Sequence, residues 1–248
     1  MRAQLRAELL KQRSTPTGQG LFAAMLALVL LAIALHGFGL PAHDLAQRHN
    51  QLEVFGRGEL LGALFAALFG AVSITSEFRH GTIRPTFLAM PRRGRVLAAK
   101  VSASVLIGTG FGLLAGALAA GVATVALRAR GVHITLDTGD YALLIGGSAA
   151  AGGLWAAIGV GLGALIRNQV PTLIGICAWL LFVEGLLVGD VADVTKIGRF
   201  GPGAAAAAIT GQDPGTLVAP ALGAVLLVVY ATAVTFVGLL ATTRRDVA

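Results

Sequence analysis

The sequence predicts an all-α integral membrane protein that crosses the membrane six times, and three observations carry this prediction. Only 12% of the 248 residues are charged, whereas about 25% is typical of a soluble domain, and 56% are hydrophobic. The apolar residues form long blocks separated by short charged segments. The 34 glycines and the many alanines gather in those blocks, which favours helices that pack closely in lipid.

Six of these blocks are long enough, or nearly so, for a helix to cross a bilayer core about 30 Å thick. We treat residues 1–248 as one transmembrane domain. The second block is short, so we expect it to begin near Glu59 or to run past Ser76. The first exceeds the roughly 7–15 apolar residues of a signal peptide, so we expect it to remain in the chain. The predicted spans are Gly20–Leu40, Leu60–Thr75, Val101–Leu127, Tyr141–Ile166, Val170–Gly189 and Leu217–Ala241.

The distribution of basic residues predicts the orientation. Of the 19 Lys and Arg residues, 13 fall on the side that holds both termini, the segment 76–100 and Arg167, and 6 fall on the other side. Because cytoplasmic segments carry the excess of Lys and Arg, we expect both termini in the cytoplasm and the chain in the plasma or inner membrane. Most of the residues behind the net charge of +7 would then lie at the cytoplasmic membrane surface, close to anionic lipid head groups. Because this accounts for the basic charge, we expect no nucleic-acid partner.

Three short helices are predicted outside the six spans, and two of them precede the first span and the last. Residues 1–18 are too polar to cross the membrane, but Leu5 and Leu9 lie one turn apart among charged residues. This pattern favours an interfacial helix on the inner membrane face, with a disordered basic tail as the alternative. Before the last span, Pro202 followed by Ala204–Ala208 favours a second short helix. This helix either dips back into the outer leaflet or stays in the outer loop.

The segment 76–100, between the second and third spans, is the most informative part of the sequence. Gly81 can turn the chain where it leaves the membrane. Pro85 suits the first position of a helix and Pro91 ends it, so we predict a short cytoplasmic helix over Pro85–Met90. Such a helix on a basic loop either docks into a partner or lies on lipid. Its large apolar side chains are those of Phe87, Leu88 and Met90.

The same segment resembles the membrane-spanning subunits of ABC-2 type ATP-binding cassette exporters, especially actinobacterial ones. These permeases often carry a similar stretch after the second span, Glu-Phe-Arg-His-Gly-Thr-Ile-Arg followed by Ala-x-Pro-Arg-Arg-x-Arg-Val-Leu-x-Ala-Lys. The overall layout is also similar, with an N-terminal interfacial helix and a Pro-Gly/Ala-rich helix before the last span. The matching residues here are Glu77–Arg84, Ala89, Pro91–Arg93 and Arg95–Lys100.

The resemblance implies that this chain is the permease of an exporter for an amphiphilic small molecule, lipid or peptide. Its partners would be two copies of a separate ATPase subunit and a second permease, identical or paralogous, with the substrate path between the two permeases. This sequence has no G-x-x-x-x-G-K-[ST] P-loop, so ATP and Mg would bind the ATPase subunit. We also find no catalytic constellation and no metal-ligand spacing, so we expect no enzyme activity, cofactor or metal in the chain itself.

In this family the loop after the second span carries a coupling helix that contacts the ATPase. By resemblance, the residues of Glu77–Arg84 would position that helix, and the three apolar side chains of Pro85–Met90 would dock. The implied coupling residues are Glu77, Arg79, His80, Gly81, Thr82, Ile83, Arg84, Phe87, Leu88 and Met90.

Glu184 is the only acid that the predicted spans place well inside the membrane, and an intramembrane carboxylate is a functional candidate. Because it lies close to the outer end of its span, it either pairs there or serves a substrate or proton path. Trp155, Trp179 and Tyr230 either pack the core or form a ligand cage. Three G-x-x-x-G pairs allow close helix contact, within one chain or across a dimer. They are Gly112/Gly116, Gly159/Gly163 and Gly185/Gly189.

Two other functions remain open from the sequence. One is a non-transporting membrane scaffold or sensor whose loop recruits a cytosolic partner. The other is a small ion-coupled carrier with Glu184 as its proton site. A neighbouring gene for a free-standing ATPase would favour the exporter over both.

Overall fold

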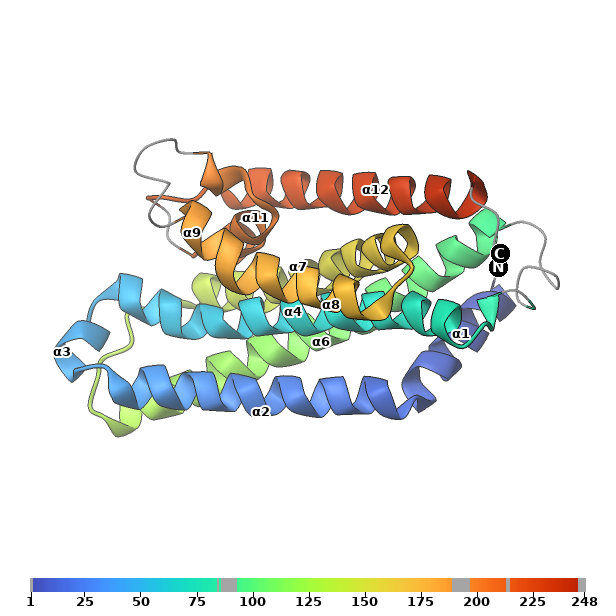
Figure 1. The fold of residues 1–248 in the computed structure, drawn as a ribbon. Coiled ribbons are helices and arrows are strands. Elements are labelled where there is room, and N and C mark those ends of the chain that lie inside the picture. The colour runs from blue at the N-terminus through green and yellow to red at the C-terminus, as the bar shows by residue number, and fades with distance from the viewer. Residues whose placement is uncertain (1, 84, 86–92, 189–196, 213–214, 245–248) are drawn as a thin grey trace.

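In the computed structural model, residues 2–83, 85, 93–188, 197–212 and 215–244 are described, and helices are the only regular elements among them (Figure 1). The α8, η1 and α9 elements follow one another without a break, and η1 is a π-helical turn. The elements are α1 (Arg2–Ser14), α2 (Pro16–Gly39), α3 (Ala42–Leu45), α4 (Arg48–Arg79), α6 (Arg93–Ala129), α7 (Thr138–Ile166), α8 (Gln169–Ala178), η1 (Trp179–Val183), α9 (Glu184–Val188), the 3-10 turn η2 (Gly198–Phe200), α11 (Pro202–Ile209) and α12 (Pro220–Arg244).

Six of these helices are long and apolar enough to cross a membrane, as the sequence predicts. They are α2, α4, α6, α7, the segment Gln169–Leu186 and α12. The six helices run back and forth, and α1 and the last residues of α12 lie at the same end of the bundle (Figure 1). We call this the termini end. The opposite end, which holds α3 and α11, is called the loop end.

Two spans begin well before the residues expected from the sequence. The α4 helix begins at Arg48 rather than near Leu60, and α6 begins at Arg93 rather than at Val101. The early turns of α4 stay helical because their polar side chains are satisfied by the protein. For example, Gln51 is fully buried, and its Nε2 donates to the carbonyl oxygens of Leu45 (2.9 Å) and His133 (2.8 Å).

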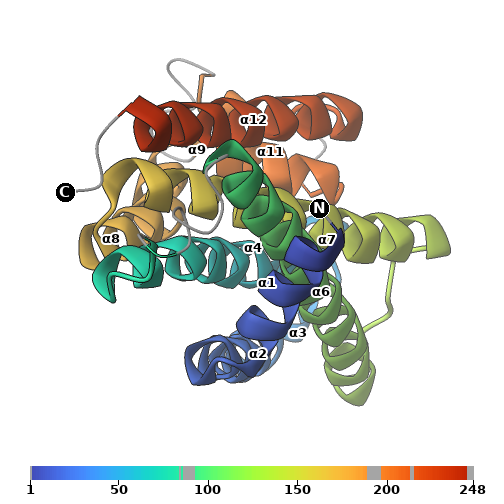
Figure 2. The same cartoon turned by 90° about the vertical axis from the view of Figure 1, so that its right-hand side faces the viewer.

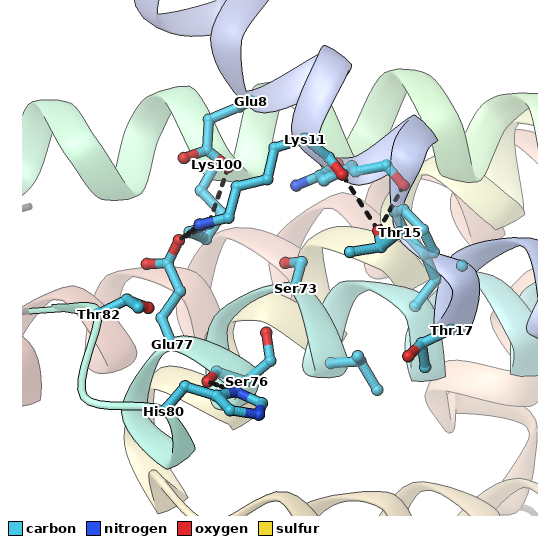
Figure 3. A pocket seen from close by; sticks show the side chains of 14 residues that line it. Glu8, Lys11, Thr15, Thr17, Ser73, Ser76, Glu77, His80, Thr82 and Lys100 are labelled. Carbon is cyan, nitrogen blue, oxygen red and sulfur yellow. Dashed lines mark hydrogen bonds and ion pairs between the residues drawn. The ribbon is translucent and has the colours of Figure 1, made fainter.

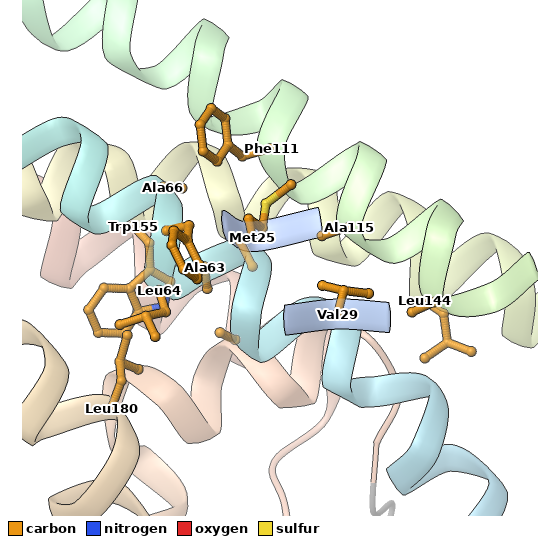
Figure 4. Close-up of a cluster of buried hydrophobic side chains, with 14 of the residues drawn as sticks. Met25, Val29, Ala63, Leu64, Ala66, Phe111, Ala115, Leu144, Trp155 and Leu180 are labelled. Atoms are coloured by element: carbon orange, nitrogen blue, oxygen red, sulfur yellow. The ribbon is translucent and has the colours of Figure 1, made fainter. Parts of the chain in front are cut away.

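Helices α4 and α7 form the centre of the bundle. In their most apolar stretches 72% and 67% of the residues are buried, against 22% in α2 and 17% in α12. Figure 4 shows side chains of this core, among them Val29 of α2, Leu64 of α4, Phe111 of α6 and Trp155 of α7. The outer helices therefore leave much of their apolar surface for lipid.

Glycines let the central helices touch backbone to backbone. A Cβ atom on Gly159 would lie 2.0 Å from the carbonyl oxygen of Ala67, and one on Gly112 would lie 1.9 Å from that of Ser148. Two of the three G-x-x-x-G pairs thus make contacts within one chain, of α7 with α4 and of α6 with α7. Gly185 has open space around it, and the other glycine of its pair lies outside the described residues.

Short helices form at two of the three predicted places outside the spans. The α1 helix packs on the first part of α6, and Figure 2 shows it crossing that end of the bundle. The α11 helix packs against α12, α7 and α4, and most of its alanines are buried. The predicted helix Pro85–Met90 lies outside the described residues except for Pro85.

Candidate functional site

Four charged side chains meet at the termini end and form what we call the ion-pair cluster: Glu8, Lys11, Glu77 and Lys100 (Figure 3). Lys100 Nζ lies 2.8 Å from Glu8 Oε2 and 3.1 Å from Glu77 Oε1. Glu77 Oε1 also pairs with Lys11. The side chains of Lys100 and Glu77 are only 1% and 2% exposed, whereas that of Lys11 is 51% exposed. Each buried charge therefore has an opposite charge beside it, which burial requires.

Three helices supply the cluster. Glu8 and Lys11 are three residues apart and so share one face of α1. Glu77 lies in the last turn of α4, and Lys100 lies near the start of α6. Glu77 lies just before the connection between α4 and α6 and Lys100 lies about two turns after α6 begins, so their ion pair joins the two helices on either side of that connection.

Hydrogen bonds extend the cluster toward the core. Gln12 Nε2 donates to Ser104 Oγ at 3.2 Å, and Ser104 Oγ lies 3.3 Å from Ser73 Oγ. The same three helices, α1, α6 and α4, are thereby joined a second time. A cavity of about 280 Å³ lies beside these groups, and Figure 3 shows the residues that line it. The site thus combines paired charges with a neighbouring cavity, and its contacts join three helices.

The predicted coupling residues divide into buried and exposed ones. Glu77 and Ile83 are buried, and Glu77 is engaged in the cluster. Arg84, Phe87, Leu88 and Met90 lie outside the described residues. The exposed residues are Arg79, His80, Gly81 and Thr82.

Gly81 has a φ of 67°, a left-handed conformation that glycine adopts without strain. The turn predicted at this residue is therefore present at the end of α4. His80 Nδ1 lies 2.7 Å from the carbonyl oxygen of Ser76, so the imidazole stays on the last turn of the helix.

The turn between α7 and α8 lies against the same end of α4. Arg79 Nη1 donates to Gln169 Oε1 at 3.4 Å, and the guanidinium of Arg167 lies 5.4 Å from the ring centroid of Phe78. Arg167 Nη2 also donates to the carbonyl oxygen of Ala241 on α12 at 2.8 Å. The last turn of α4 is thus connected to α1, α6, α8 and, through Arg167, α12.

Glu184, the other predicted candidate, lies at the loop end. Its Oε1 accepts hydrogen bonds from the backbone N–H groups of Gly203 (2.7 Å) and Ala204 (2.9 Å) in the first turn of α11. These N–H groups have no partner within the helix, and a carboxylate is a favourable acceptor for them. Glu184 is 7% exposed, so its contacts correspond to the pairing alternative, with backbone amides as the partners.

Glu59 is a further acid buried inside a span, so the expectation that Glu184 is alone there is wrong. It is 4% exposed, and its Oε2 lies 3.4 Å from Gln212 Nε2, which also donates to Thr210 Oγ1 at 2.6 Å. The error follows from the predicted start of the second span. Because α4 begins at Arg48, Glu59 falls in its interior rather than at its border.

Three members of the cluster were not singled out from the sequence. The spacing of Glu8 and Lys11 is a weak signal, because such pairs are common on exposed helices. In the sequence, Lys100 cannot be distinguished from the other basic residues predicted on the cytoplasmic side. Only the packing of α1 on α6 shows that these side chains meet Glu77.

No family model and no protein of curated function matches the sequence. The function is therefore argued from the residues of the chain and from the geometry of this site. In that geometry, buried ion pairs join three helices at the termini end of a bundle whose six long helices are apolar enough to span a membrane.

Proposed function

We propose that this chain is the membrane-spanning subunit of an ABC-2 type exporter. It would move an amphiphilic compound out of the cell, with ATP hydrolysed by a separate ATPase subunit. The observation that supports this most is the ion-pair cluster at the base of the loop between α4 and α6. That loop carries the stretch resembling the family's coupling loop, and a coupling loop must be firmly joined to the helices that it moves.

The cluster would pass a displacement of the loop to three helices at once. Glu77 in the last turn of α4 and Lys100 in the first part of α6 flank the loop, and the 3.1 Å ion pair between them would oppose separation of the two helices. Glu8 and Lys11 add α1 to the same unit. Because packed interiors are hard to compress, force applied at this end moves α4, α6 and α1 together.

From α4 the displacement would reach the rest of the bundle. This helix packs along α7, α6, α2 and α8, and it is the most buried span. Glycine contacts such as that of Gly159 with Ala67 keep α4 and α7 within backbone contact, so the pair moves as one body. In the proposed mechanism, closure of two ATPase subunits alternates the interface between two permeases in this way.

The contacts of Glu184 give little support to the ion-coupled carrier. A proton site on a transport path must exchange its proton and its partners, whereas Glu184 Oε1 is held by two backbone N–H groups of α11. If the carrier were correct, Glu184→Gln would abolish transport without affecting assembly. We expect transport to persist in this variant.

The test of the exporter targets the apolar side chains of the loop. The double substitution Phe87→Asp with Leu88→Asp should leave the protein inserted, because the loop lies outside the six spans. It should abolish co-purification with an ATPase encoded beside this gene, since two carboxylates cannot enter an apolar pocket without a large desolvation cost. ATPase activity stimulated by the permease would be lost as well.

The matched control exchanges the two apolar residues, Phe87→Leu with Leu88→Phe, and keeps the apolar character of the loop. It should retain the ATPase subunit. Normal co-purification and stimulated ATPase activity in the double aspartate variant would refute the docking role. A gene neighbourhood with no ATPase carrying Walker motifs would count against the exporter and for the scaffold or sensor.

A further inference from the structure

Glu59, the second acid buried inside a span, takes no part in the proposed coupling of the loop to the bundle. It lies eleven residues after the first residue of α4, or about 16 Å along the helix axis, and is 4% exposed. Its Oε2 lies 3.4 Å from Nε2 of Gln212. Because Gln212 follows α11, the chain after that helix reaches α4 at this depth from the loop end.

The backbone after α11 directs Gln212 toward α4. The N–H groups of Gly211 and Gln212 donate to two carbonyl oxygens in the last turn of α11, at 3.0 and 3.3 Å, which is the Schellman arrangement of a helix end. Gly211 has a φ of 72°, which this arrangement requires and glycine adopts without strain. On α4, Gly56 leaves space for the incoming side chain, because a Cβ atom there would lie 2.1 Å from Gln212 Oε1. The Gln212 carboxamide therefore lies against α4 within one turn of Glu59.

The described residues provide no cation for Glu59. On α4 itself, Arg57 pairs with Glu53 instead. The helices packed against α4, which are α2, α6, α7, α8 and α11, contain no Asp, Glu, Lys or Arg over their apolar stretches. The titratable side chains that α7 and α8 add, Tyr141 and Cys177, supply no positive charge. The apolar stretches are residues 16–35, 101–127, 141–166, 170–178 and 202–209.

The two acids buried at the loop end have different hydrogen-bond donors. Glu184 Oε1 accepts two hydrogen bonds, of 2.7 and 2.9 Å, from backbone N–H groups at the N-terminus of α11, where a negative charge is favourable. Glu59 has one long hydrogen bond from a neutral carboxamide, and the charge that acts on it from another element is that of Glu184, also an acid. Because a buried carboxylate without a counter-charge is costly, Glu59 is the acid of this pair that should hold a proton.

We propose that Glu59 is a proton-binding site and that its proton is linked to the docking of α11, by which we mean the contact of Gln212 with α4. With the proton bound, Glu59 is uncharged and can remain buried beside Gln212. Without it, the carboxylate needs water, which reaches the site when Gln212 leaves α4. Undocking therefore releases one proton and docking takes one up. The docked state is favoured at low pH and loses stability as the pH rises.

The α11 helix depends on contacts at its ends because its own side chains bury little surface. Ala204–Ala208 make up five of its eight residues, and burial of an alanine removes little apolar area from water. Its first turn is held by Glu184, and the segment after its last turn is held by Glu59 through Gln212. A change of charge at Glu59 therefore acts directly on the docking of this helix.

The inference is independent of the exporter. It concerns this chain alone and its test uses no ATPase subunit, so either proposal can fail without the other. It also differs from the ion-coupled carrier, which places the proton on Glu184.

Infrared spectroscopy observes the proton directly. The protein is reconstituted in ether-linked lipids, whose lack of ester groups leaves the C=O absorption of a protonated carboxyl group visible. At neutral pH we expect this band in the wild type, with a shift in heavy water because the acidic hydrogen exchanges. Glu59→Gln should remove the band, whereas Glu184→Gln and the exposed control Glu53→Gln should retain it. The proposal is overturned if the wild type lacks the band or if Glu59→Gln retains it.

Hydrogen exchange measures the link to α11. The readout is the protection factor of the amides of residues 207–212, in which the intrinsic effect of pH on exchange cancels. Because undocking releases one proton, this factor should fall about tenfold for each pH unit between about pH 5 and pH 7. Glu59→Gln keeps a neutral, hydrogen-bonding side chain, so its protection factor should not vary with pH. Equal pH dependence in the two proteins overturns the proposal.

A pair of glycine variants tests the contact of Gln212 with α4. Gly56→Ala places a methyl group where the Gln212 carboxamide lies and should lower the protection of residues 207–212 roughly fivefold. Gly146→Ala, on α7, adds the same methyl group where no other atom lies within 4 Å and should leave protection unchanged. Equal protection in the two variants overturns the proposal. If Glu59→Gln does not insert, the wild type decides, and a protection factor that stays constant between about pH 5 and pH 7 overturns the proposal.

Discussion

The two ends of the bundle each bury a carboxylate, and they stabilise it in different ways. At the termini end, Glu77 pairs with two lysines that come from other helices. At the loop end, Glu184 accepts hydrogen bonds from two backbone N–H groups of α11, which follow it by 19 and 20 residues in the sequence. The first arrangement joins three helices distant in sequence, whereas the second fixes only one short helix.

This difference predicts how far the destabilising effect of a substitution should extend from each end of the bundle. An ion pair depends on full charges held out of water, so loss of one partner leaves an uncompensated charge. A backbone cap depends on dipoles, and water or a neighbouring group can replace it more easily. We therefore expect effects across the bundle from the termini end and local effects from the loop end.

The largest effect is expected for Lys100→Met. This change keeps the length and apolar stem of the side chain but leaves Glu8 and Glu77 without their buried cation. The free energy of unfolding should fall by about 3–5 kcal/mol. Denaturant titration in detergent micelles measures it. Arg95→Met, on the exposed face of the same helix, is the control and should change it by less than about 0.5 kcal/mol. Equal midpoints of denaturant unfolding for Lys100→Met and Arg95→Met would show that the ion-pair cluster stabilises the fold no more than an exposed charge does.

A smaller and more local effect is expected for Glu184→Ala. The loss of the acceptor for Gly203 and Ala204 should cost about 1–2 kcal/mol, as for other helix caps. Hydrogen exchange of the first amides of α11 should become faster, while the amides of α1 should be unaffected. Glu184→Gln, which keeps an acceptor oxygen, should exchange more slowly than Glu184→Ala. Faster exchange in α1 as well would break the distinction between the two ends.

The smallest effect is expected for Lys11→Met. Lys11 pairs with the same carboxylate as Lys100, but its side chain is 51% exposed and Lys100 remains to neutralise Glu77. Exposed ion pairs typically contribute about 0–1 kcal/mol, so the free energy of unfolding should fall by no more than that. The same micelle titration measures it. If Lys11→Met lowered the free energy of unfolding as much as Lys100→Met, burial would not explain the difference in stabilisation expected between the two lysines.

Much of the fold could be predicted from the sequence because the bilayer imposes simple local rules. A span must be long and apolar and must satisfy its own backbone, so hydrophobic blocks alone locate six helices. Local turn chemistry likewise predicts the turn at Gly81 and the helix after Pro202, and the structure has both. The sequence does not predict the start of α4, because its first turns contain polar residues such as Gln51, whose partners His133 and Thr135 are distant in the chain.

The candidate site was only half predictable. Glu77 stands out because it belongs to the stretch that resembles a coupling loop. Its partners Glu8, Lys11 and Lys100 do not stand out, because acidic and basic residues are common near a membrane border. Whether they pair with Glu77 depends on how α1 lies across α6. The tryptophans were ambiguous for the same reason. An aromatic side chain inside a span can face a neighbouring helix, lipid or a cavity, and only the packing of α7, α8 and α12 distinguishes these.

By itself, the sequence determined that the chain is a helical membrane protein with six spans, which of its segments are basic, and that one short helix precedes the first span and another precedes the last. These properties follow from hydrophobicity, charge and backbone preference along the chain, and each acts within a few residues. The tertiary structure alone decided that Glu77 is buried between two lysines, that two glycine pairs act within one chain, and that both tryptophans line one cavity. These depend on the crossing of helices far apart in sequence, which no local preference specifies.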